Sequence, residues 1–152
     1  MNIDPALTNL LAEFGGQIGL PALALDADGA TALAFDGGVQ INFQYRADAD
    51  ALWLITDLGV PANGPAVYED LLKGNHFWHA TLGATLSLSG DETPRVILTL
   101  PIGWRGLNGA RLARIMETYL NTIRAWSEVI AAPSDDDDAP ADAADMGAMI
   151  RI

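Results

Sequence analysis

The chain has 152 residues, which is enough for a single domain with one hydrophobic core. Its 20 acidic and 8 basic residues leave a formal net charge of −12. This charge argues against nucleic acid and anionic membrane surfaces as partners, because binding phosphate requires clustered lysines and arginines. Cysteine is absent, so disulfides, thiol nucleophiles and thiolate metal sites are excluded.

The sequence also carries no signal for a membrane or for secretion. No apolar run approaches the roughly 18–20 residues that a membrane-spanning helix requires. The first residues lack the basic region that precedes the apolar part of a secretory signal. We therefore expect a cytoplasmic protein with no membrane contact.

The first expected element is a helix. Asp4 is a good N-cap, and Pro5 suits the first helical position. Apolar residues then recur at helical spacing as far as Ile18, and Gly19 ends the pattern.

Period-two alternation follows and predicts strands. Leu23 and Leu25 suggest a first strand, and Leu33 and Phe35 suggest a second. Residues 39–46 alternate most clearly, and residues 52–60 are apolar on both faces. The short turns between these segments predict an antiparallel meander.

The second half of the domain is expected to contain two helices and two strands. A helix ends at Gly74 and Asn75, and residues 84–102 predict two strands joined by a turn. A long amphipathic helix, roughly residues 107–130, closes the domain. The order α-β-β-β-β-α-β-β-α predicts an α+β fold, in which three helices flank an antiparallel sheet of five to six strands.

The composition changes after residue 130. We therefore divide the chain into a folded domain at residues 1–130 and an acidic tail at residues 131–152, which we expect to be disordered. The aspartate run at 135–138 lacks the glycine and the late glutamate of an EF-hand loop. A solvated tail is therefore expected rather than a calcium site.

His76 and His79 are the only histidines, and they flank Phe77 and Trp78. Helical zinc hydrolases place two histidines four residues apart with a glutamate beside the first. Here the interval is three and no glutamate intervenes, so we predict neither a metal site nor catalysis and expect no cofactor. A small metal-dependent enzyme centred on the two histidines stays open as an alternative.

Several motifs, in order along residues 7–130, resemble the class I type III secretion chaperones of Gram-negative bacteria. These are the first helix with its Gly-Leu-Pro ending (7–21), the strand-turn-strand segment (23–43), LLKGN (71–75) and the tryptophan-bearing last helix (119–130). The resemblance implies a homodimer without enzymatic activity or bound nucleotide. Each protomer would hold an extended segment of a cognate effector protein in an export-competent state.

The resemblance also implies where partners bind. The family generally holds its client on apolar patches of the first helix and the sheet, which here correspond to Leu7, Leu11, Phe14, Leu23, Leu25, Phe35, Ile41, Phe43 and Trp53. The second helix and its surroundings generally form the dimer interface, which here corresponds to Val67, Tyr68, Leu71, Leu72, Phe77 and Trp78.

The residues themselves support a binding surface. The sequence has more large apolar side chains than one thin core can bury, among them Trp53, Phe77 and Trp78. Some apolar surface is therefore expected to be exposed as grooves. A client could add a strand to a sheet edge and insert side chains into such grooves. A regulatory interaction domain on the same fold, with no role in export, is the second alternative that the sequence leaves open.

Overall fold

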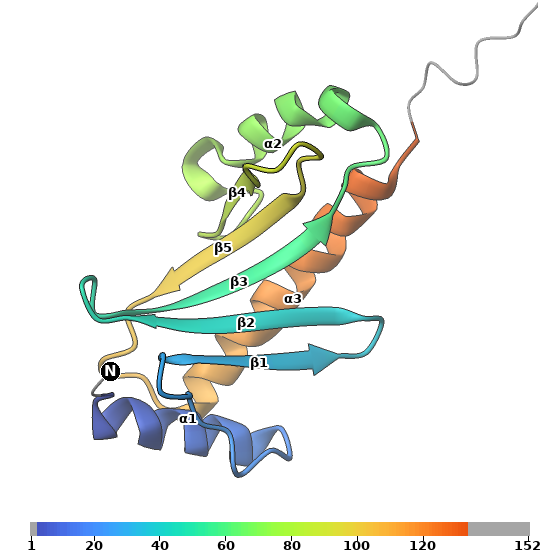
Figure 1. Ribbon diagram of the computed structural model, residues 1–152. Helices are drawn as coiled ribbons and strands as arrows, with labels where there is room; N and C mark the ends of the chain where they lie inside the picture. The colour runs from blue at the N-terminus through green and yellow to red at the C-terminus, as the bar shows by residue number, and fades with distance from the viewer. Residues whose placement is uncertain (1–2, 134–152) are drawn as a thin grey trace, which may run out of the picture.

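Figure 1 shows the computed structural model of the chain, which describes residues 3–133. The elements in chain order are α1 (Pro5–Gln17), β1 (Ala30–Phe35), β2 (Val39–Arg46), β3 (Ala51–Gly59), η1 (Gly64–Val67), α2 (Tyr68–Gly74), η2 (His76–Trp78), β4 (Thr85–Leu88), β5 (Val96–Ile102) and α3 (Gly109–Ala131). The two η elements are short 3₁₀ helices.

The strands form one antiparallel sheet in the order β1-β2-β3-β5-β4. Helix α3 crosses one face of this sheet, α1 lies near the β1 edge, and α2 lies near the β4 edge (Figure 1). The predicted α+β class, with an antiparallel sheet and three helices, is confirmed, with five strands.

The core lies between α3, α1 and the inner face of the sheet. Alternate residues of β2, including Ile41 and Phe43, are fully buried. The Tyr119 hydroxyl of α3 donates to the carbonyl oxygens of Leu98, at 2.7 Å, and Leu54, at 3.3 Å. Burial raises the pKa of Tyr119 to about 12. This contact ties α3 to the two central strands β3 and β5.

The segment around Leu23 and Leu25 does not form the expected strand. The chain instead turns back onto the end of α1, where the Leu20 amide donates to the Gly15 carbonyl at 2.7 Å. A Cβ at Gly15 would lie 2.2 Å from the Leu20 oxygen, so only glycine allows this approach. Leu23 is therefore buried in the core as part of a loop and not as part of a strand.

The last helix reaches Ala131, and residues 134–152 lie outside the described part of the chain. Most of the predicted tail therefore falls outside it as well. Within residues 3–133, no helix is both long enough and apolar enough to cross a membrane.

Candidate functional site

The most exposed large apolar side chains of the described residues gather next to α2. Of the nine that are exposed, four lie between positions 72 and 82. They are Leu72 (72% exposed), Phe77 (70%), Trp78 (53%) and Leu82 (60%), and we call them the 72–82 patch. Exposed aliphatic and aromatic side chains grouped in this way indicate a surface that another protein covers.

The backbone under this patch is strained. Phe77, Trp78 and Leu82 have φ angles of 50°, 55° and 52°, in the left-handed region that glycine normally occupies. Such conformations cost of order 1–3 kcal/mol each and persist where the surroundings enforce them. Strain of this kind is concentrated at functional sites, so the patch is a candidate binding element.

Two contacts enforce this conformation. The Asn75 side chain donates to the Leu86 carbonyl at 2.9 Å and accepts from the Leu86 amide at 2.8 Å, which fastens the end of α2 to β4. The Trp126 indole donates to the Ala80 carbonyl at 3.0 Å. The segment between α2 and β4 is therefore held at both ends, and its aromatic side chains are presented on a fixed frame.

Gly74 is required at the base of the patch. A Cβ at this position would lie 2.3 Å from the Trp126 ring, so a side chain would push α2 away from α3. Glycine had been interpreted from the sequence as a helix-ending signal, and α2 does end at Gly74. Its close contact with Trp126 was not foreseen, because the two positions lie far apart in the chain.

The two histidines lie in and just after η2 and are exposed. The His76 ring stacks edge-on against Phe77 with 4.4 Å between ring centroids. Among residues 3–133, no group of three or more His, Cys, Asp or Glu side chains is placed to hold a metal ion. The histidines thus form part of the rim of the 72–82 patch.

The six residues predicted for the dimer interface divide into two sets. Leu72, Phe77 and Trp78 are exposed, and Tyr68 is half-buried. Val67 and Leu71 are only 3% and 4% exposed, respectively, and belong to the core. The structure therefore corrects the prediction for Val67 and Leu71, because they stabilise α2 against the sheet and offer no free surface.

A second apolar surface lies at the opposite side of the molecule, beside the free edge of β1. A shallow cavity of about 220 Å³ lies there between α1, α3 and β1, and its lining includes Phe14, Ile18, Phe35 and Leu120. Next to the end of α1, residues 19–23 line a further cavity of about 330 Å³. We call these two cavities together the β1-edge groove.

The nine residues predicted to hold a client are only partly brought together. Phe14 and Phe35 line the first cavity of the groove and Leu23 lines the second, whereas Leu25 is half-buried nearby in sequence. Leu7, Leu11, Ile41 and Phe43 are fully buried, which contradicts their expected place on an accessible surface of the single chain. Burial inside the domain accounts for the helical spacing of Leu7 and Leu11 and for the alternation of Ile41 and Phe43.

Two exposed residues of the groove were missed as candidates. Ile18 is 37% exposed and Leu20 is 48% exposed. Ile18 had been assigned to the apolar stripe of the first helix, and Leu20 to the loop after it. Ile18 shares the first cavity with Phe35 of β1, and the return of the chain onto Gly15 places Leu20 in the second; no local pattern signals that arrangement.

Trp53, the remaining client candidate, lies on the outer face of the sheet. Its neighbours on β2 and β5 in the register are Gln44 and Pro101. The Arg46 guanidinium carbon lies 5.5 Å from the centre of the Trp53 ring. No described helix covers this face (Figure 1), so Trp53 stays half-buried and accessible.

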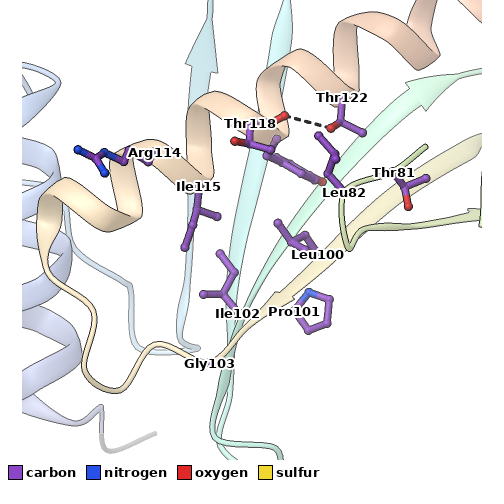
Figure 2. Close-up of a pocket in the computed structure, with 11 residues that line it drawn as sticks. Thr81, Leu82, Leu100, Pro101, Ile102, Gly103, Arg114, Ile115, Thr118 and Thr122 are labelled. Carbon is purple, nitrogen blue, oxygen red and sulfur yellow. Dashed lines mark hydrogen bonds between the residues drawn. The ribbon is translucent and has the colours of Figure 1, made fainter. Parts of the chain in front are cut away.

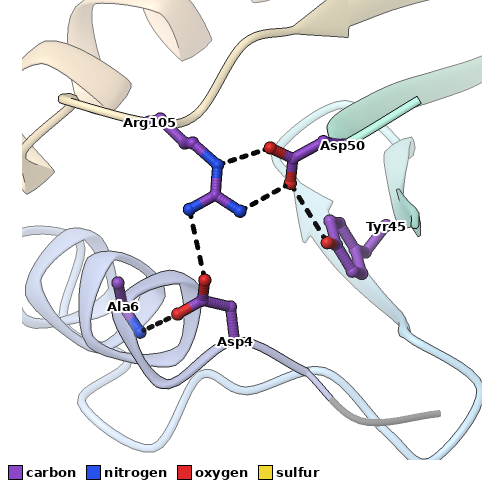
Figure 3. Close-up of polar contacts among 5 residues, drawn as sticks. All are labelled: Asp4, Ala6, Tyr45, Asp50 and Arg105. Atoms are coloured by element: carbon purple, nitrogen blue, oxygen red, sulfur yellow. Dashed lines mark hydrogen bonds and ion pairs between the residues drawn. The ribbon is translucent and has the colours of Figure 1, made fainter. Parts of the chain in front are cut away.

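One polar cluster positions α1 rather than forming a site (Figure 3). Asp4 caps the helix by accepting from the Ala6 amide at 2.9 Å, and its second oxygen contacts Arg105 at 3.2 Å. Arg105 also forms an ion pair with Asp50, and it holds the pKa of that carboxyl below its usual value. The cluster joins the start of α1 to the β2–β3 turn and to the loop before α3.

Residues 9–127 match the Tir chaperone protein (CesT) family. Among curated proteins, the chain is 36% identical over 80 residues to the transcriptional anti-antiactivator ExsC of Pseudomonas aeruginosa strain PAO1. That alignment covers 52% of this chain and 55% of the relative, so it spans about half of each protein.

Solved structures of similar fold include complexes with bound proteins. The ExsC–ExsE complex matches with a TM-score of 0.73 at 29% identity, over 88% of this chain and all of the matched chain. The HopA1–SchA chaperone–effector complex matches at 0.69 and 20% identity, over 84% and 99% of the two chains. The Yersinia pestis type III secretion chaperone SycH, solved with a fragment of YscM2, matches at 0.63 and 19%, over 78% and 97%. The last two similarities concern the fold alone.

Proposed function

Because the chain belongs to the Tir chaperone protein (CesT) family, we propose that it is a homodimeric chaperone of type III secretion. It binds a segment of a cognate effector in the bacterial cytoplasm and keeps that segment extended and ready for export. It carries out no catalysis and uses no metal, nucleotide or other cofactor.

The observation that carries the dimer is the 72–82 patch. Its side chains are the most exposed apolar groups of the described chain, and they stand on a strained segment held by Asn75 and Trp126. A second copy that buries these side chains would remove apolar surface from water, which stabilises the dimer by roughly 25 cal/mol per Å² buried. This gain would offset the free-energy cost of the strained backbone. A rigid, preformed surface also loses little conformational entropy when it binds.

The β1-edge groove is the proposed place for the client. Among the strands of residues 3–133, β1 pairs with β2 on one side and with none on the other. An extended client segment can pair with this free edge and insert apolar side chains beside Phe35 and Ile18. The similarity to a chain solved in the ExsC–ExsE complex supports the binding of another protein.

Two substitutions separate the dimer from the client site. We expect Leu72→Asp to halve the mass measured by light scattering, because it places a charge at the centre of the interface. We expect Leu20→Asp to leave the dimer intact and to weaken the capture of a co-expressed effector. Both positions are exposed, so both variants should fold. An unchanged dimer in Leu72→Asp would contradict the proposed interface.

A regulatory role is the second candidate, and the similarity to an anti-antiactivator favours it. In that case the bound protein is a component of transcriptional control rather than a secreted effector. Co-purification of the full chain with proteins encoded beside its gene decides between the two roles. A captured antiactivator with no captured effector would favour regulation.

A metal-dependent enzyme is the remaining alternative. It would require further ligands beside His76 and His79, and residues 3–133 supply no group of three. Elemental analysis of the purified chain tests it directly. A stoichiometric metal that is lost in a His76→Ala/His79→Ala variant would revive this alternative.

A further inference from the structure

The largest cavity among those described lies between α3, β5 and the loop at residues 81–83. It has a volume of about 470 Å³, within the range of sites that accept a ligand or several side chains. Leu82, Leu100, Ile102 and Ile115 supply its apolar lining, and Arg114 stands at one end of the group (Figure 2). We call it the α3–β5 cavity.

One polar side chain of this cavity, Thr81, lacks a partner among residues 3–133, whereas the hydroxyls of Tyr119 and Thr122 are hydrogen-bonded to backbone carbonyls. Thr81 is 1% exposed, and its hydroxyl makes no hydrogen bond within the described part of the chain. A buried hydroxyl without a partner costs about 1–3 kcal/mol. A bound backbone or side chain could satisfy it. The lining includes no acidic residue, in contrast to the cavities that contain Glu117 or Asp26.

The charge of α3 differs from that of the rest of the protein. Arg46, Lys73, Arg95 and Arg105 all form ion pairs with carboxylates. Within residues 3–133, three further basic residues have no ion pair. All three lie on α3: Arg111, Arg114 and Arg124. Of these three, Arg114 lines the α3–β5 cavity, whereas Arg124 lines the shallow cavity on the other flank of the helix.

The chain contains a segment of complementary chemistry. Residues 134–145 carry six aspartates, and residues 146–150 read MGAMI. An acidic stretch followed by apolar residues matches a surface on which Arg114, for which no ion pair is found within residues 3–133, lies at an apolar cavity. We propose that this tail folds back along α3 and places residues 146–150 in the α3–β5 cavity.

The length of the tail fits this path. Met146 follows Pro133 by thirteen steps along the chain, and a random-coil chain of that many steps has an end-to-end distance of about 20 Å. The distance along α3 from Ala131 back to Thr118 also spans thirteen residues, or about 20 Å. Effective concentration is greatest when the linker length matches the span, and it reaches the millimolar range. A segment with an intrinsic Kd of about 100 μM would then be docked about 90% of the time.

The absence of cysteine makes the test direct. A single cysteine is introduced by Thr118→Cys, at an exposed position that lines the cavity. Its rate of reaction with iodoacetamide, a neutral reagent, is measured in the full chain. The same measurement with Thr8→Cys, at an exposed position on α1, reports the unprotected rate.

We expect the thiol at position 118 to react several-fold faster when the tail carries Met149→Asp and Ile150→Asp. These two positions lie outside the described residues 3–133, so the substitutions change no side chain of the described domain. Arg114→Glu should give a similar increase, and raising the salt concentration should do so as well. Arg124→Glu makes the same charge change on the other flank of α3 and should have little effect.

Three results would overturn the proposal. The first is a reaction rate that does not respond to the tail substitutions. The second is an equal increase in Arg124→Glu, which would indicate general electrostatics rather than docking in this cavity. The third is protection that depends on protein concentration and not on the tail, which would assign the cavity to a second copy of the chain. The inference does not depend on the proposed client binding, but it shares Leu82 with the 72–82 patch, so the tail and a second protomer would compete for that side chain.

Discussion

The β1 edge and the β4 edge of the same sheet present different kinds of binding surface. The outer edge of β1 pairs with no other strand of the described residues, and it runs beside a shallow groove that Phe35 and Ile18 line. At β4, the side chain of Asn75 hydrogen-bonds to the strand, and the apolar groups beyond it stand on a strained segment. The first edge suits an extended chain that supplies its own backbone hydrogen bonds. The second suits a rigid partner of complementary shape.

This difference suggests how one small domain can bind two partners, each at a surface that the other does not fit. An open strand edge accepts many sequences, since main-chain hydrogen bonds do not depend on side chains. A patch that is fixed in one conformation accepts only a surface that matches it. We therefore associate the β1 edge with the client and the β4 edge with the second protomer.

The largest expected effect comes from removing the support of the β4 edge. Trp126 is 7% exposed and packs against Gly74. Trp126→Ala should lower the free energy of unfolding by about 3–5 kcal/mol, because it leaves a cavity and an unpaired Ala80 carbonyl. Hydrogen exchange should rise at α2 and β4 more than at β1. The control is Val129→Ala, at a more exposed position of α3, which should have little effect. An equal rise in hydrogen exchange at both edges would contradict the independence of the two edges.

A smaller effect is expected from Asn75→Ala. This change removes the two hydrogen bonds to Leu86 and leaves a backbone donor and acceptor without partners. We expect a loss of about 1–3 kcal/mol in chemical denaturation, together with weaker dimerisation. The control is Asn121→Ala, which removes an exposed amide from α3. If dimerisation persists unchanged in Asn75→Ala, the frame is not needed to present the patch.

Phe77→Gly tests whether strain is stored in the patch. Phe77 is 70% exposed and has a φ of 50°, so glycine relieves the backbone and removes little buried area. We expect the free energy of unfolding of the single chain to rise by about 1 kcal/mol while the dimer weakens. Phe77→Ala removes the ring but keeps the strain, so it should weaken the dimer without the gain in stability. Identical stability of the two variants would argue against stored strain.

The smallest expected effect is a loss of folding stability at low pH. It concerns the Arg105 cluster, which holds the start of α1, and not the β4 edge. The Arg105 guanidinium lowers the pKa of Asp50 in the folded chain. The contribution of this pair is therefore fully present above the ordinary aspartate pKa of about 4. It is lost as the pH falls through the lowered pKa, because Asp50 is then protonated. Arg105→Gln should remove this part of the pH dependence, as measured by thermal unfolding between pH 3 and pH 6. A variant that keeps the same acid dependence would exclude the pair as its source.

Local patterns were sufficient where one periodicity extended over many residues. The helical stripe of α3 and the alternation of β2 each predicted the element and its buried face. The same reasoning failed at Leu23 and Leu25, which alternate like a strand but lie in a loop, with Leu23 buried beside Gly15 and Leu25 half-buried. Two apolar residues at period two cannot distinguish a strand from a loop that is packed against a helix.

Adjacent apolar residues limited the prediction of the site. Leu71 and Leu72 are neighbours of the same chemistry, yet Leu71 is 4% exposed and Leu72 is 72% exposed. In a helix as short as α2, no repeated pattern shows which of the two faces inward. The asparagine at position 75 likewise matched a family motif without revealing its role, because its partner Leu86 is on a separate strand.

The order of residues along the chain by itself determined the secondary structure, the α+β class and the family resemblance, since these depend on periodicity and on turn chemistry between near neighbours. The tertiary structure decided which apolar residues remain in contact with water. That choice depends on contacts between distant positions, such as Gly74 with Trp126 and Gly15 with Leu20. Exposure is a property of packing, and packing brings together residues that the linear sequence keeps apart.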